Sequence, residues 1–249
     1  MTMKKAMLAL LIAAAAAPAL AASSSTVNFS NGREGWVGVE SADGLSGTVI
    51  DSGLGIGAPA LHTTVNDTFG LNWGTKTNQA FLGDYTKSPS VTLGLDVSAK
   101  SITYEGIEVA RNLVVELRDY DNKPAGLPYT SVWYDLGTIS ASQSGWQHLS
   151  VTISDTSSAL LPSGWGGYGG ADSAGGPALP HDRSFASVLS GVDEIVFTTF
   201  VPGYFYGYTN YDVAVDNVSI AAVPEPASYG MMLGGMGLLG WIARRKQRA

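Results

Sequence analysis

Aromatic side chains crowd two segments of the chain, where their rings could stack on sugars. A Gly-rich segment contributes Trp165 and Tyr168, and a later one contributes Tyr204, Tyr206 and Tyr208. Exposed apolar rings often mark a binding surface. Because aromatic residues also fill β-sheets, the same rings could close one end of a sandwich. The sequence leaves both readings open, and burial of the rings would count against sugar binding.

Acidic side chains suggest a second kind of chemistry, the binding of a structural Ca²⁺ ion. Calcium prefers oxygen ligands, and a single ion can tie the first strand of a sandwich to the last. The candidate ligands are Glu34, Asp43 and Asp216. The alternative is that Glu34 is solvated and Asp216 supports only a bulge in its strand.

Signals for catalysis are weak. The chain has no Cys, no Gly-x-Ser-x-Gly sequence and no His-Glu-x-x-His sequence. His62, His148 and His181 are far apart, and Asp119 and Asp121 lie in a segment typical of a hairpin turn. We therefore predict that the protein is not an enzyme. A glycan hydrolase, the weaker alternative, would need two carboxylates that face each other in a cleft.

The charge of the chain excludes one class of partner. Between residues 22 and 222, eight Lys and Arg residues stand against 20 Asp and Glu residues, a net charge of −12. Such a domain repels phosphate backbones, so we expect no nucleic-acid partner.

The N-terminus has the features of a secretory signal. Lys4 and Lys5 precede an apolar run over residues 6–17. Ala19 and Ala21 are small residues at the positions that a signal peptidase requires. We predict a signal helix at residues 1–21 that signal peptidase removes after Ala21.

The C-terminus combines three features in a fixed order. The motif Pro224-Glu225-Pro226 comes first, an uncharged apolar run at about residues 227–243 follows, and a basic cluster ends the chain. The run is long enough for one transmembrane helix, and the basic cluster would remain on the cytoplasmic side. This cluster consists of Arg244, Arg245, Lys246 and Arg248.

This arrangement over residues 223–249 resembles the PEP-CTERM sorting signal. The resemblance implies recognition by an exosortase, a membrane protease or transpeptidase, and delivery to the cell envelope, surface or extracellular matrix. It implies no activity for the rest of the chain. The membrane anchor would be transient if the tail is processed, or permanent if the tail is a plain single span.

Residues 22–222 read as one all-β domain. Apolar residues alternate with polar ones over 91–97, 113–118 and 149–153, as in strands with one buried face. We expect further strands at 26–29, 35–40, 69–73, 79–82, 130–136, 194–200 and 211–220, a long flexible loop at 161–180 and a helical turn at 185–189. A bulge near Asp216 and Asn217 would turn Val213, Val215, Val218 and Ile220 into the core. These features predict a jelly-roll β-sandwich.

Four short blocks support this architecture. They are Phe29-x4-Glu34-Gly35-Trp36, the segment 80–85, the segment 185–195 and the segment 215–220. In this order they resemble the laminin IV type A (laminin B) domain and, more loosely, jelly rolls of carbohydrate-binding modules. The leading hypothesis is thus an exported structural or binding protein. The first alternative is a carbohydrate-binding module for exopolysaccharide.

Overall fold

A computed structural model describes residues 23–40, 46–57, 59–223 and 235–236. The predicted signal helix lies outside the described residues, as does the predicted transmembrane helix apart from residues 235–236. Within the described ranges, no helix has the length and apolar character needed to cross a bilayer. Residues Ser24–Ala222 form one compact unit.

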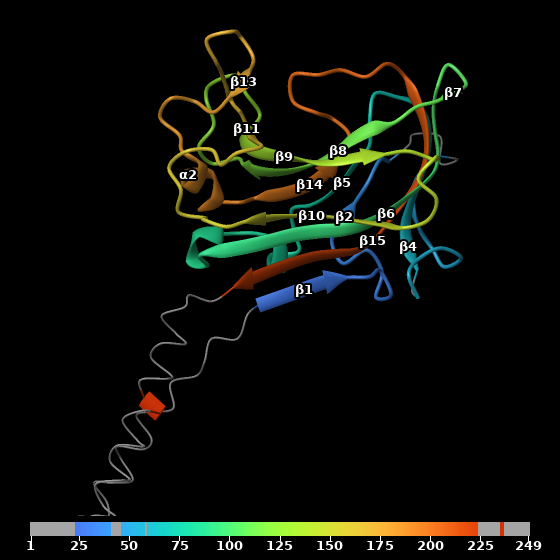
Figure 1. The fold of residues 1–249 in the computed structure, drawn as a ribbon, viewed down its shortest axis with the longest axis horizontal. Coiled ribbons are helices and arrows are strands. Elements are labelled where there is room, and N and C mark those ends of the chain that lie inside the picture. Colours follow the sequence, from blue (N-terminus) through green and yellow to red (C-terminus); the bar gives the residue numbers. More distant parts are fainter. Residues whose placement is uncertain (1–22, 41–45, 58, 224–234, 237–249) are drawn as a thin grey trace, which may run out of the picture. The chain divides into compact units, whose positions relative to one another are not determined.

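The compact unit is an all-β sandwich, as predicted (Figure 1). One sheet has seven strands, and its main order is β10-β6-β15-β4-β3. Strand β1 pairs with β15 and β7 pairs with β6. The bounds are β10 Gln147–Ile153, β6 Ser90–Tyr104, β15 Thr209–Val223, β4 Ala60–Thr68, β3 Gly47–Asp51, β1 Ser23–Val27 and β7 Ile107–Glu108.

The second sheet has six strands in the order β11-β9-β8-β14-β5-β2. Its bounds are β11 Trp165–Tyr168, β9 Thr130–Ile139, β8 Arg111–Asp119, β14 Glu194–Thr198, β5 Asn72–Thr75 and β2 Trp36–Val37. A small hairpin joins β12 Gly170–Ala171 to β13 Pro177–Ala178. The short helices are η1 Gln79–Phe81, η2 Tyr85–Lys87 and α2 Phe185–Leu189.

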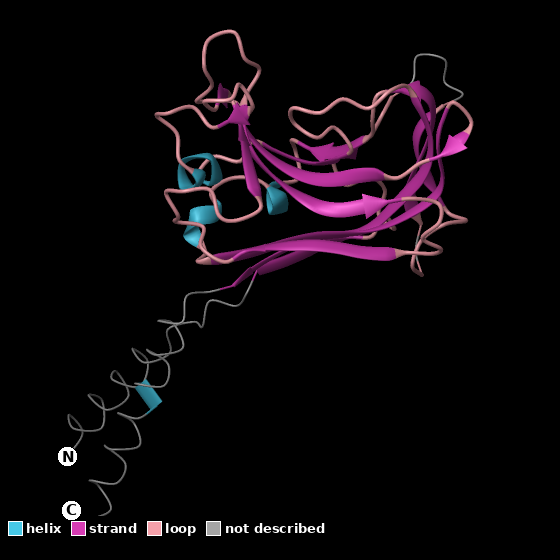
Figure 2. Cartoon of the chain, turned by 45° about the horizontal axis from the view of Figure 1, so that its top comes forward, coloured by secondary structure: helices cyan, strands magenta, loops and turns pink. Residues whose placement is uncertain are grey.

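The core lies between the two sheets, which form separate layers in Figure 2. The alternating residues identified in the sequence supply much of it, including Leu93, Leu95 and Leu117. Trp36 and Trp73 are fully buried. The Trp36 ring meets that of Phe81 edge to face at 5.2 Å, a favourable geometry for an aromatic pair.

The bulged last strand behaves as expected. The side chains of Val213, Val215, Val218 and Ile220 all belong to the core cluster. Asn217 lies between the two pairs with a φ of 47°, in the left-handed region where an extra residue can be inserted. This residue changes which alternate positions of β15 face inward.

Two expectations about local structure were wrong. Residues 79–82 are not a strand, because the Asn78 side chain accepts a hydrogen bond from the Ala80 N–H and starts the helical turn η1. The segment 161–180 is not one long loop, because β11 pairs with β9 and the β12–β13 hairpin follows. The helical turn predicted at 185–189 is confirmed as α2. Strands β3 and β4 were not predicted.

Candidate functional site

The loop between β14 and β15 carries the most exposed rings of the domain. Tyr204 is 59%, Phe205 84% and Tyr208 59% exposed. The loop turns at Gly203, which has a φ of 81°, and the Tyr204 N–H donates to the Val201 carbonyl at 3.0 Å. This tight turn favours glycine and keeps the rings that follow it outside the core.

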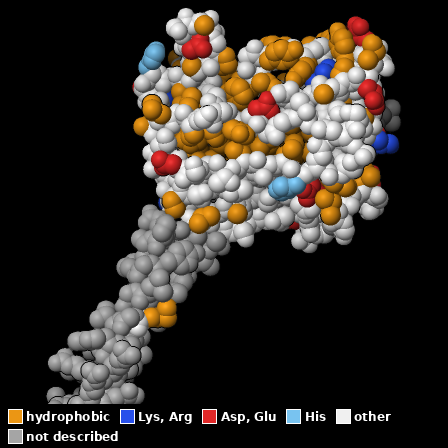
Figure 3. Space-filling view, in the orientation of Figure 1, with side chains coloured by type: hydrophobic (Ala, Val, Ile, Leu, Met, Phe, Trp, Pro, Cys, Tyr) orange, Lys and Arg blue, Asp and Glu red, His pale blue; other side chains and the backbone are white. Residues whose placement is uncertain are grey.

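Neighbouring rings extend this surface. Phe69, from the segment between β4 and β5, stacks on Tyr208 with 4.3 Å between ring centroids. Tyr206 lies 4.8 Å from Tyr204, and its hydroxyl group donates to Asn112 Oδ1 at 3.2 Å. We call the set Phe69, Phe200, Tyr204, Phe205, Tyr206 and Tyr208 the aromatic end. Figure 3 shows hydrophobic side chains gathered along the upper margin of the domain over this loop.

Tyr206 is the anchor of the aromatic end. The Arg111 guanidinium carbon lies 4.4 Å from the centroid of the Tyr206 ring, a cation–π contact. Arg111 itself is buried and donates to Thr209 Oγ1 at 2.8 Å. A buried cation therefore fixes one ring while its neighbours remain exposed.

The structure does not bring the five predicted aromatic residues together. Trp165 is only 9% exposed and packs edge to face on Phe185, with 5.1 Å between ring centroids. Tyr168 is three residues later on the same strand and so faces the opposite side of the sheet, where it lies 5.3 Å from Tyr129. Burial of Trp165 counts against a role as an exposed stacking ring. Tyr204 and Tyr206 do contact each other, and Tyr208, on the same loop, stacks on Phe69.

A charged cluster occupies the outer face of the six-stranded sheet near Tyr168. Arg118 Nη2 lies 2.5 Å from Glu116 Oε2, and its Nη1 lies 3.0 Å from Glu194 Oε2. Ser131 and Tyr120 donate to the same two carboxylates at 2.5 and 2.6 Å. These two carboxylates are therefore held by donors, and their geometry provides no free acid and base pair for hydrolysis.

Tyr129 covers this cluster. The Arg118 guanidinium carbon lies 4.4 Å from the centroid of its ring. Burial raises the pKa of the Tyr129 hydroxyl well above its usual range, and the nearby Glu116 carboxylate raises it further. Tyr129 therefore remains neutral at physiological pH.

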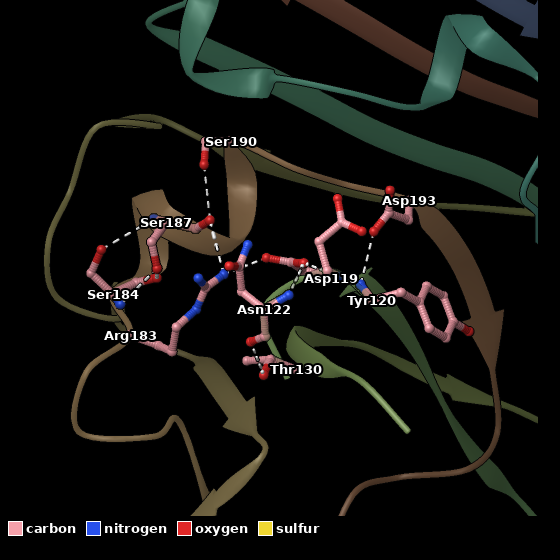
Figure 4. Close-up of polar contacts among 10 residues, drawn as sticks. Asp119, Tyr120, Asn122, Thr130, Arg183, Ser184, Ser187, Ser190 and Asp193 are labelled. Carbon is pink, nitrogen blue, oxygen red and sulfur yellow. Dashed lines mark hydrogen bonds and ion pairs between the residues drawn. The ribbon is translucent and has the colours of Figure 1, made fainter. Parts of the chain in front are cut away.

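A polar cavity of about 630 Å³ lies beside the β8–β9 turn. Its charged lining residues are Asp121, Lys123, Asp182 and Arg183. Figure 4 shows Arg183 reaching Asp119, with which it forms an ion pair. The Ser184 side chain accepts from the Ser187 N–H at 3.1 Å and caps α2.

The Asp119 carboxylate is buried and hydrogen-bonded. It is 1% exposed, and its Oδ1 accepts from the N–H groups of Asp121 and Asn122 at 2.9 and 3.1 Å. These bonds close the predicted hairpin turn. Arg183 was not predicted as the partner of Asp119, because 64 residues separate the two.

The predicted calcium ligands have different environments. Glu34 is exposed, Asp43 lies outside the described residues, and Asp216 is fully buried. Asp216 Oδ2 accepts from the Ile56 N–H at 2.7 Å. In the part of the chain that the structure describes, no three His, Cys, Asp or Glu side chains are placed to hold a metal ion. Calcium binding therefore stays a prediction that would need backbone carbonyl ligands.

We expect Ca²⁺, if it binds at Asp216, to stabilise the domain by about 2.7 kcal/mol at a hundredfold excess over its Kd.

Without the ion, burial raises the pKa of Asp216, so the folded protein binds a proton at this carboxylate more tightly than the unfolded protein does. Stability then falls as the pH rises from 3.8 through the raised pKa. The Asp216→Asn substitution should remove this fall and abolish the calcium response. Thermal melts with Ca²⁺ or EDTA at several pH values test this. A calcium response that survives the substitution would contradict it.

The C-terminal segment matches a known sorting signal. Residues 222–247 match the family model described as the PEP-CTERM protein-sorting motif. The tail is a PEP-CTERM sorting motif. It marks a secreted protein that is processed at its C-terminus for sorting to the envelope or surface, and it implies an exosortase-type processing enzyme. No curated protein matches the chain.

Solved structures provide distant likenesses to the domain. One is a family 11 carbohydrate-binding module from Clostridium thermocellum, in complex with a β-1,3-1,4-mixed-linked tetrasaccharide. It is 17% identical in sequence with a TM-score of 0.43, and the match covers 81% of this chain and 97% of that one. The CBM22-1–GH10 modules of endo-1,4-β-D-xylanase 10B from the same organism are 11% identical with a TM-score of 0.43. That match covers 80% of this chain but only 28% of the xylanase chain.

A carbohydrate esterase from the Shiga toxin-encoding bacteriophage phi24B is 13% identical with a TM-score of 0.43, covering 81% of this chain and 99% of that one. At these values the likenesses assign neither a ligand nor a reaction. The resemblance to laminin IV type A stays a prediction.

Proposed function

We propose that this protein is a non-catalytic cell-surface protein whose sandwich binds an exported polysaccharide through the aromatic end. The signal helix at 1–21 would export the chain. The helix at about 227–243 would hold it in the membrane until an exosortase-type enzyme acts near Pro224, Glu225 and Pro226. This order of events makes the described domain face the outside of the cell.

The observation that carries the binding proposal is the exposure of three rings within five residues, Tyr204, Phe205 and Tyr208. Burying large rings stabilises a fold, so rings left in water at one end of a well-packed domain are typical of a ligand surface. The Tyr hydroxyl groups add hydrogen-bonding capacity to the apolar ring faces, and both are suited to the C–H and O–H groups of a sugar.

A triple substitution tests the proposal. We expect Tyr204→Ala, Phe205→Ala and Tyr208→Ala together to weaken binding to the exopolysaccharide of the producing cells at least tenfold, about 1.4 kcal/mol. Affinity electrophoresis of the processed protein measures this loss. Because the three rings are largely in water, Tm should change little. Leu160→Ala, at a side chain that is 79% exposed elsewhere, is the matched control and should bind normally. Unchanged binding by the triple variant would contradict the proposal.

Hydrolysis of a glycan remains the less favoured alternative. It would need a free pair of carboxylates, whereas Glu116 and Glu194 both accept hydrogen bonds from Arg118. Release of reducing ends from the bound polysaccharide by the processed protein would favour this alternative.

A further inference from the structure

An exposed carboxylate borders the aromatic end where β4 ends. Asp67 is exposed and lies two residues before Phe69. Its N–H donates to Asn210 Oδ1 at 2.9 Å, and Asn210 lies two residues after Tyr208. Because the rings of Phe69 and Tyr208 stack on each other, Asp67 lies beside the base of this pair.

Two more carboxylates come from the hairpin between β6 and β7. A Cβ atom at Gly207 would lie 2.4 Å from Cε2 of Tyr104, so the Tyr104 ring rests against the loop that carries the exposed rings. Glu105 follows Tyr104 directly, and Glu108 lies on β7, which pairs with the end of β6. Both glutamates are exposed. We call Asp67, Glu105 and Glu108 the acidic rim.

The two basic residues that flank this hairpin in the sequence do not balance the acidic rim. Arg111 contacts the ring of Tyr206, but it is buried. Lys100 is held by the Asp212 carboxylate, with 3.3 Å between Nζ and Oδ2. Figure 3 shows acidic side chains next to hydrophobic ones at the upper right of the domain, near the position of β7 in Figure 1. Residues 22–222 as a whole carry a net charge of −12, so the domain adds to the negative potential.

Exposed rings beside unbalanced carboxylates are suited to a positively charged ligand. The face of an aromatic ring attracts a cation, and so does a carboxylate. An amino sugar has an apolar C–H face for a ring and an ammonium group at its edge for the acidic rim. A neutral sugar would leave the carboxylates unused, and an acidic sugar would be repelled. The acidic rim therefore restricts which sugars the rings can hold.

We propose that the aromatic end binds a cationic polysaccharide, a chain of amino sugars with free ammonium groups. This inference rests on the function proposed above, because it names the class of polysaccharide for the same surface. The rings stack on the sugar, and the acidic rim pairs with its ammonium groups. Complementary charge also speeds the encounter of the chain with the domain.

Titration calorimetry of the processed protein with defined oligosaccharides tests this proposal. The probes are a glucosamine hexamer, the same hexamer with every amine acetylated, and a galacturonate hexamer. We expect the glucosamine hexamer to bind about tenfold more tightly than the acetylated one, and the galacturonate hexamer not to bind. Raising the salt from about 0.1 M to about 1 M shortens the Debye length from about 10 Å to about 3 Å, so it should remove most of this preference.

Neutralising the acidic rim should have the same effect as salt. We expect Asp67→Asn, Glu105→Gln and Glu108→Gln together to weaken binding of the glucosamine hexamer about tenfold and to leave binding of the acetylated hexamer unchanged. All three side chains are exposed, so Tm should change little. Asn also tolerates the left-handed backbone of residue 67, where φ is 51°.

A matched control makes the same change in net charge elsewhere. It combines Asp121→Asn, Asp155→Asn and Asp182→Asn, at exposed positions in the β8–β9 turn, after β10 and before α2. This variant should bind the glucosamine hexamer nearly as the wild type does. An equal loss in the rim and control variants would overturn the proposal, because net charge alone would then explain the binding.

Other outcomes separate a failure of this inference from a failure of the proposed function. Equal binding of the two glucosamine hexamers, or no binding of the cationic one, would overturn the cationic class. The proposed function would still stand in that case if the triple variant at Tyr204, Phe205 and Tyr208 lost binding to the exopolysaccharide. Binding of the glucosamine hexamer that survives this triple variant would overturn both. Equally tight binding of a lysine hexamer would overturn the inference by showing that the surface selects charge and not a saccharide.

Discussion

Arg118→Met is expected to lower the free energy of unfolding by about 3–5 kcal/mol, because it removes the cation between two buried carboxylates. Glu116 is 3% and Glu194 8% exposed, and both lie within 3.0 Å of Arg118 nitrogens. Burial opposes the positive charge, but Glu116, Tyr129 and Glu194 together outweigh this effect and raise the pKa of Arg118. The charge therefore persists at every physiological pH.

Chemical denaturation and thermal melts measure this effect. Lys123→Met, at an exposed position in the β8–β9 turn, is the matched control and should change stability by less than about 0.5 kcal/mol. Adding Glu116→Gln to Arg118→Met should restore part of the loss, because it removes one of the orphaned charges. Equal melting of Arg118→Met and Lys123→Met would show that the cluster contributes nothing to stability.

Asp119→Ala is expected to lower the free energy of unfolding by about 3–5 kcal/mol as well. In a domain of this size this loss lowers Tm by roughly 6–20 °C. The substitution leaves Arg183 without its carboxylate partner and removes the acceptor for two N–H groups of the β8–β9 turn. Arg183→Met should have a comparable effect, because it leaves the buried Asp119 unpaired.

Asp121→Ala is the control for this pair of variants. It lies two residues away on the same turn, but it is exposed. Melting by differential scanning calorimetry should place Asp121→Ala close to the wild type. If Asp119→Ala melted with it, the ion pair in Figure 4 would not support the turn.

Strands with a regular alternation were predictable from the sequence. The patterns at 91–97, 113–118 and 149–153 correspond to β6, β8 and β10, because each has one face in the core. Strand β11 was missed because its sequence Trp-Gly-Gly-Tyr lies in a Gly-rich segment, and glycine weakens the strand signal. The rings of Trp165 and Tyr168 were predicted to share one binding surface. Their positions differ by an odd number, however, which places them on opposite faces of a strand.

The partners of the polar clusters could not be predicted in the same way. Arg118 and Glu194 are 76 residues apart, and they meet because β8 and β14 pair directly at these two positions. Phe69 and Tyr208 likewise meet because β4 pairs with β15. Strand order and register determine both contacts, and neither can be read from local periodicity.

The most direct test of the account is mass spectrometry of the protein from cells and medium, beside a Pro224→Ala and Pro226→Ala double variant. We predict a mature chain that begins at Ala22 and ends between Val223 and Pro226, which keeps β1 and β15 intact. We also predict that the double variant keeps its tail and stays in the membrane. A wild-type chain intact through Ala249 would contradict processing and leave the tail as a permanent anchor.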